Sequence, residues 1–209
     1  MEEILERIKK GIQYRDMSLD IDESAEKRVT GYATTFNEPY TLYEDTDVVF
    51  REQVDSNAFN NADLSDVIMQ YDHRGRVFAR IRNNTLELRT DARGLFVSAN
   101  LGGTEIGRQL YEEIRGGYTD KMSFAFTVSA DKVERYEENN RRVYLRTITQ
   151  IKKVYDVSAV SIPANDGTSI SARSCLDGIL EKEKAEALEK SEREQKRKRL
   201  QLRLKLMGG

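Results

Sequence analysis

The chain has 209 residues, of which 33% are charged and 38% are hydrophobic, and its net charge is −2. This length suits one compact domain with an extension, and the charge gives no reason to expect binding to nucleic acid or to a membrane. The single cysteine, Cys175, excludes an internal disulfide framework and is typical of a reducing cytosol.

Metal and cofactor sites are not expected. The chain holds one histidine, His73, and no CxxC pair, so the usual ligands of zinc are missing. No phosphate-binding glycine loop or GxGxxG pattern is present, and we therefore expect no nucleotide cofactor. No apolar run approaches the ~20 residues that cross a bilayer, and the N-terminus shows no signal-peptide pattern. The predicted setting is the cytoplasm of a cell.

Alternating apolar residues predict strands in the first half of the chain. The expected elements are a short helix at 2–10 and strands at 17–21, 29–36 and 48–54. The first two strands are expected to form a hairpin, and Pro39 limits the second because proline lacks a backbone donor. Residues 64–71 form an apolar segment that leads into the short loop at 72–75.

The second half is expected to contain one helix and several strands. In residues 104–114, Ile106, Leu110 and Ile114 have the spacing of one helix face, and Thr104 is the expected N-cap. The glycines at 116–117 are expected to end this helix. The further strands are expected at 121–130, 142–149 and 154–162. Together these elements predict a β-rich α+β fold.

The segment from Leu176 onward differs from the rest. It carries ten Lys or Arg against seven Asp or Glu, and Leu188 is the only sizeable apolar residue between Leu180 and Leu200. Such a segment cannot bury much surface alone, so we expect an exposed helix or a tail that needs a partner. We therefore divide the chain into a domain at 1–174 and a charged helical tail at 175–209.

Three residues are candidates for hydrolytic chemistry. His73 is the natural proton carrier near neutral pH, although a lone histidine is more often a surface or structural residue. Ser123 lies among large apolar residues of a predicted strand, which would hold a nucleophile rigidly or simply accommodate a small side chain. Asp156, an acid in an apolar strand, must be paired or lie at an exposed edge, and it could orient an imidazole.

Six sequence blocks, in this order, resemble the prohead proteases of tailed bacteriophages. They are GYATTFN (31–37), VDSNAFNNA (54–62), YDHRGRVFARI (71–81), DARGLFVSANL (91–101), RGGYTDKMSFAFTV (115–128) and YDVSAVSIPAN (155–165). Each block alone is a weak signal, but six in order with compatible spacing are specific. The best-matching part is 29–164.

The resemblance implies a serine endopeptidase in which Ser123 is the nucleophile, His73 the general base and Asp156 the third member. Asp156 stands where the family often has glutamate, and Ala125 stands where it usually has glycine. The backbone amide of Phe124 is a candidate oxyanion donor from the geometry of the strand. The resemblance also implies a β-barrel with flanking helices, similar to the herpesvirus assembly proteases.

The family's task implies the partners. The expected substrates are the scaffold segment of the major capsid protein and the protease itself, cut inside the assembling procapsid in the host cytoplasm. The tail is expected to dock the protease to a scaffold or shell, and a homo-oligomer is also considered. Two other hypotheses stay open, namely a catalytically inactive assembly or scaffold protein that retains a protease-like domain, and a host β-barrel binding domain.

Overall fold

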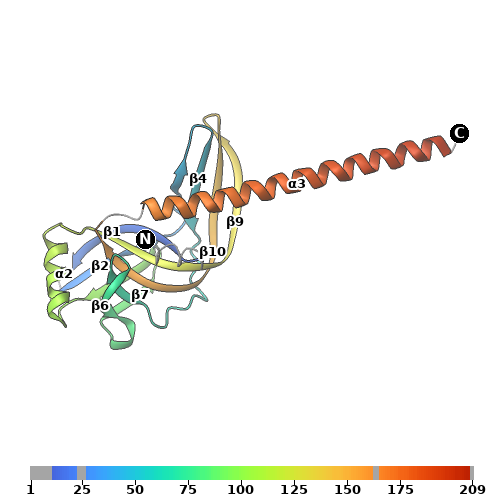
Figure 1. Cartoon of the computed structure of the whole chain (residues 1–209). Helices are drawn as coiled ribbons and strands as arrows, with labels where there is room; N and C mark the ends of the chain where they lie inside the picture. The colour runs from blue at the N-terminus through green and yellow to red at the C-terminus, as the bar shows by residue number, and fades with distance from the viewer. Residues whose placement is uncertain (1–10, 23–26, 162–164, 208–209) are drawn as a thin grey trace. The chain divides into compact units, whose positions relative to one another are not determined.

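The computed structural model describes residues 11–22, 27–161 and 165–207 (Figure 1). The helix expected at 2–10 lies outside these residues. By its internal contacts the chain divides into two compact units, residues 1–171 and residues 172–209. Each unit is described by itself.

The first unit is dominated by strands. They are β1 (Gln13–Asp22), β2 (Arg28–Thr35), β3 (Tyr40–Glu44), β4 (Val48–Val54), β5 (Ile68–Tyr71), β6 (Arg74–Arg80), β7 (Leu86–Thr90), β8 (Gly94–Asn100), β9 (Lys121–Glu138) and β10 (Arg141–Val160). A 3-10 turn, η1 (Ile81–Asn83), follows β6, and helix α2 (Glu105–Arg115) precedes β9. The β-rich character expected from the sequence is therefore confirmed.

The strands form one branched sheet. Its order is β3-β4-β10-β9-β1-β2-β8-β7, and β5 and β6 branch from β10. Strand β1 joins the two parts, because Gln13–Ser18 pairs with β9 and Leu19–Asp22 pairs with β2. The expected hairpin between β1 and β2 is antiparallel, as predicted.

The expected barrel is not confirmed, because the sheet formed by the described strands does not close. Each of β3, β6 and β7 has a single neighbour, so the ladder ends there instead of returning on itself. The reason is the long strand β10, which pairs with β4 over 142–148 and with β5 over 156–159. Register shifts between Ile148 and Asp156 bend β10 between these two stretches. The same irregularities explain why the sequence predicts two strands where the structure has one.

Helix α2 forms where the apolar spacing predicts it. The side chain of Thr104 accepts a hydrogen bond of 3.0 Å from the backbone N–H of Gly107, which confirms the N-cap. Leu110, Tyr111 and Ile114 are buried and join the main core. Gly117 follows the helix with a φ of +72°, a conformation that glycine adopts without strain.

A buried ionic cluster connects β1, β4 and β10. Glu52 of β4 accepts hydrogen bonds from Arg15 at 2.6 Å, from Arg146 at 2.9 Å and from the hydroxyl of Tyr40 at 2.7 Å. All three charged side chains are buried. Burial alone raises the pKa of Glu52, but the charges of Arg15 and Arg146 and these hydrogen bonds outweigh it, so the pKa lies below its usual range.

The tail is helical. Helix α3 (Asn165–Met207) runs through the charged segment, and nearly all the side chains of 177–199 are exposed, Leu188 by 64%. An ion pair of 2.5 Å between Arg193 and Glu189, one turn apart, is typical of a solvated helix face. Among the helices that the structure describes, none is long and apolar enough to cross a membrane.

Candidate active site

His73 lies at the tip of the hairpin formed by β5 and β6. The loop consists of Asp72 and His73, whose φ angles of +48° and +57° are those of the tight turns that suit the twist of a hairpin. The turn is tied to β10, because the backbone N–H of Asp72 donates to the carbonyl of Ala159 at 2.9 Å. The backbone N–H of Ser161 in turn donates to the carboxylate of Asp72 at 2.9 Å. These bonds hold the imidazole close to the end of β10.

Asp156 is the partner of His73. Its Oδ1 atom lies 2.5 Å from Nδ1 of His73, and Ser158 donates its hydroxyl to the same oxygen at 2.7 Å. Asp156 is 2% exposed and lies between Ala125 of β9 and Ile68 of β5. An exposed edge position is therefore excluded. The aspartate side chain is therefore long enough to contact the imidazole.

The contact assigns a tautomer to the neutral ring. An ionised carboxylate can only accept hydrogen bonds, so Nδ1 must carry the hydrogen that it shares with Asp156. In neutral His73 the lone pair then belongs to Nε2, the atom that would take a proton. This is the arrangement in which a carboxylate orients a histidine base.

Ser123 lies on the same face of the sheet as Asp156. It stands directly opposite Ser158, which is two residues beyond Asp156 on β10, and residues two apart on a strand share a face. Its neighbours Met122 and Phe124 belong to the core on the other face, as the alternation of the sequence predicts. Ser123 is fully buried, and its Oγ atom forms no hydrogen bond with any residue that the structure describes.

A family model described as caudovirus prohead serine protease matches residues 14–182. The chain belongs to this family. No curated protein matches the sequence. Among solved structures, the chain is similar to the bacteriophage T4 capsid assembly protease, gp21, with a TM-score of 0.41 and 9% identity over 71% of this chain and 96% of that chain.

The family match begins at Tyr14 and so includes all but the first residue of β1, a region that the sequence blocks at 29–164 leave out. In this prohead protease family member, the ring of Tyr14 meets that of His73 edge-on, with centroids 4.5 Å apart. Tyr14 stands opposite Ala125, which in turn stands opposite Asp156. Sequence reasoning missed Tyr14, because only the pairing of β1 with β9 brings it to the histidine.

Ala125 is enclosed by these neighbours. It is fully buried between the strands that carry Tyr14 and Asp156, so the position requires a small side chain. Alanine meets that requirement. A larger residue would push on the groups that hold the imidazole.

Phe124 lies in an interior strand, opposite Arg15 of β1 and Val157 of β10. Backbone amides in such a strand are normally used in the ladder. The amide of Phe124 would have to leave that ladder to stabilise an oxyanion, and its role stays a prediction.

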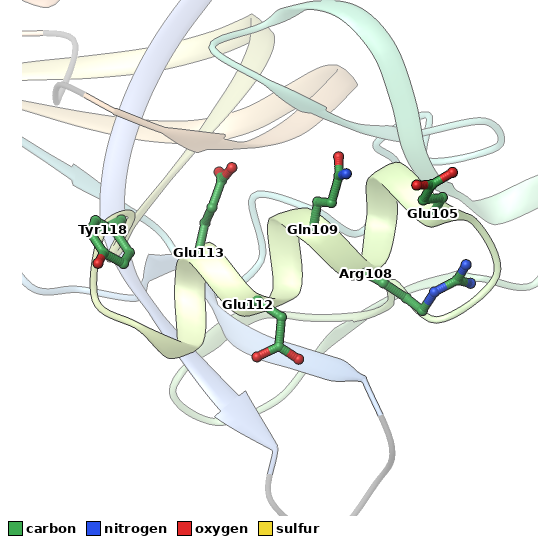
Figure 2. A pocket seen from close by; sticks show the side chains of 6 residues that line it. All are labelled: Glu105, Arg108, Gln109, Glu112, Glu113 and Tyr118. Atoms are coloured by element: carbon green, nitrogen blue, oxygen red, sulfur yellow. The ribbon is translucent and has the colours of Figure 1, made fainter.

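A surface hollow lies away from these residues. It runs along α2 and the turn after it and is lined by Glu105, Arg108, Gln109, Glu112, Glu113 and Tyr118 (Figure 2). Figure 2 shows that these side chains do not converge, since Gln109 and Glu112 point in opposite directions. None of the candidate catalytic residues lines it. The described residues also contain no cluster of His, Cys, Asp and Glu that could hold a metal ion.

Proposed function

We propose that this member of the prohead protease family is an active serine endopeptidase, with Ser123 as nucleophile, His73 as general base and Asp156 as the residue that orients the base. The observation that carries the proposal is the buried contact of 2.5 Å between Asp156 and His73, on the sheet face that also bears Ser123. Family membership supports the reaction class.

The proposed chemistry follows from these positions. Nε2 of His73 takes the proton of Ser123 as Oγ bonds to the carbonyl carbon of the peptide. The imidazolium gives this proton to the leaving amine when the peptide C–N bond breaks. Water then attacks the acyl-enzyme, with His73 taking its proton, and Ser123 regains a proton from His73 when the acyl–oxygen bond breaks. Asp156 stabilises the positive charge of the imidazolium in both halves of the reaction.

Burial of Ser123 adds a requirement. A peptide carbonyl can reach a fully buried Oγ only after the atoms that cover it move. Catalytic hydrogen bonds in ligand-free enzymes are often long and tighten when substrate binds, so the missing bond from Ser123 does not argue against the role. We infer that substrate binding opens the site and brings Ser123 and His73 together.

The substrates that we propose are scaffold-like segments of the phage major capsid protein and the chain itself, both cut within the procapsid. The charged tail at 175–209 is proposed as the segment that docks the protease there. Its side chains are nearly all exposed between 177 and 199, which leaves them available to a partner. Kinship in fold with the herpesvirus assembly proteases is part of the same proposal.

The second candidate function is an inactive assembly protein. An inactive protein would also have a buried Ser123 with no hydrogen bond to a described residue. The two functions differ in whether Ser123 can become reactive when the protein is inside the procapsid.

Labelling with a serine-directed fluorophosphonate separates them. The probe is applied to isolated protein and to procapsids, and the labelled residue is identified by mass spectrometry. The proposal expects label on Ser123 in procapsids, loss of label in His73→Ala, and no loss in Ser129→Ala, an exposed serine on the same strand. A serine that stays inert in procapsids containing uncleaved capsid protein would favour the inactive assembly protein.

A further inference from the structure

Strand β9 has a long free edge. Its first residues, 121–126, pair with β1, but beyond Phe126 its only partner in the described part of the chain is β10. In Figure 1 the hairpin of β9 and β10 has β4 beside β10 and β9 on the outside. All residues of 129–137 are exposed. Unpaired backbone groups along an exposed edge can pair with a strand of another chain.

The charges on this edge have a particular order. The sequence Asp131-Lys132-Val133-Glu134-Arg135 reads negative, positive, neutral, negative, positive. In an antiparallel pair of identical strands centred on Val133, Lys132 lies opposite Glu134, and Asp131 lies opposite Arg135. By the two-fold symmetry each of these pairs occurs twice, and opposite charges in such positions stabilise a sheet.

The same order disfavours the neighbouring registers. A two-fold axis moved to Lys132 or Glu134 would place that charge against its own copy, and so would an axis at Asp131 or Arg135. Like charges directly opposite each other destabilise strand pairing. Val133 is therefore the one centre within this run that avoids a repulsive contact.

The side chains fit a second copy in other ways. Val133 and Tyr136 are 40% and 37% exposed, so both side chains have surface that a second strand could cover. Centred on Val133, each valine meets its own copy and each Tyr136 lies opposite the small Ala130. Asp131 already accepts a hydrogen bond from Arg146, whereas no ion pair between described residues involves Lys132 or Glu134. These two charges are the ones that a partner would neutralise.

We propose that a second copy of this chain pairs with β9 along its outer edge, antiparallel and centred on Val133. The two hairpins then form one continuous sheet across the two-fold axis. The proposal concerns self-association and does not depend on catalysis, so it can fail while the proposed protease activity holds.

The first test measures self-association of the full chain carrying Ser123→Ala, which prevents self-cleavage. Sedimentation equilibrium from about 1 µM to about 1 mM covers the range of weak dimers. We expect a monomer–dimer equilibrium that Lys132→Glu weakens by about tenfold or more, because two attractive pairs become repulsive. The double variant Lys132→Glu/Glu134→Lys exchanges the charges but keeps them complementary, and it should restore dimerisation.

A second test checks the register. Val133→Cys in a Cys175→Ser background should form a disulfide-linked dimer on mild oxidation, because residues opposite each other in an antiparallel pair have Cα atoms about 4.5–5.5 Å apart. Ser129→Cys, which would lie opposite Glu137, is the matched control and should not cross-link. A chain that stays monomeric, a dimer indifferent to Lys132→Glu, or a double variant as weak as the single one would overturn the proposal.

Discussion

Asp156 and His73 are far apart in the sequence, yet Oδ1 of one lies 2.5 Å from Nδ1 of the other inside a buried part of the sheet. The strand β10 supplies the carboxylate and the tip of the β5–β6 hairpin supplies the imidazole. Because β5 pairs in parallel with the stretch of β10 that carries Asp156, the hairpin tip with His73 lies beside this carboxylate.

Substitutions of the three proposed catalytic residues should lower protease activity to different degrees. Ser123→Ala and His73→Ala should each abolish nearly all cleavage, and combining them should cost little more, because the residues act as one unit. Asp156→Asn should lower kcat by about 10²–10⁴, since the amide no longer holds the correct tautomer or stabilises the imidazolium. Cleavage of capsid protein in reconstituted procapsids measures this. Normal processing by His73→Ala would remove the basis of the assignment.

Ser158 should act through Asp156. Its hydroxyl donates to the carboxylate at 2.7 Å, and Ser158→Ala removes that bond at a cost of about 1 kcal/mol, or about fivefold in kcat. The loss should appear in kcat, because the hydroxyl acts on the carboxylate that stabilises the imidazolium. The matched control is Ser129→Ala, whose hydroxyl donates to the backbone carbonyl of Gln150. An equal loss in both variants would indicate a general effect of serine removal.

Glu52 should make the fold sensitive to acid. The pKa of Glu52 is lowered in the folded chain. Its contribution to stability is therefore complete above the pKa of an unfolded glutamate, about 4.3. This contribution is lost as the pH falls through the lower pKa of the folded state. Glu52→Gln should lower the free energy of unfolding by about 3–5 kcal/mol at neutral pH, because Arg15 and Arg146 stay buried with one partner charge fewer.

Urea unfolding at pH 7 and at pH 3 checks the prediction. The difference between the parent chain and Glu52→Gln should shrink at the lower pH. Glu138→Gln, which breaks a surface ion pair with Arg51, is the control and should change stability little at either pH. A constant difference between parent and Glu52→Gln at both pH values would contradict the role of the charge.

The tail should be dispensable for folding but not for packaging. A chain truncated after Lys182 keeps the whole segment matched by the family and also Leu176, which is buried. We expect a melting temperature within about 2 °C of the full chain and normal labelling of Ser123 by fluorophosphonate, but few copies in purified procapsids. The control carries residues 183–209 in scrambled order, which preserves composition and charge. Normal packaging of the truncated chain would show that residues 183–209 are not the docking segment.

The local features of this protein could be predicted from its amino-acid sequence. The spacing of Ile106, Leu110 and Ile114 predicted α2 and its cap, because helix faces and caps depend on neighbouring residues. The alternation of Met122, Phe124 and Phe126 placed Ser123 on the opposite face of its strand, since side chains alternate along any strand. The ordered sequence blocks indicated the family.

The contacts between these elements could not be predicted in the same way, because they depend on how distant strands pair. That Asp156 is interior depends on strands from distant parts of the chain, β5 and β9, which lie on either side of it. Tyr14 reaches His73 through the pairing of β1 with β9, and the sheet branches instead of closing because β10 changes partners along its length. Strand pairing is non-local, so the residues around a position do not indicate which strand will lie beside it. For that reason the candidate residues could be named from sequence, while their contacts could not.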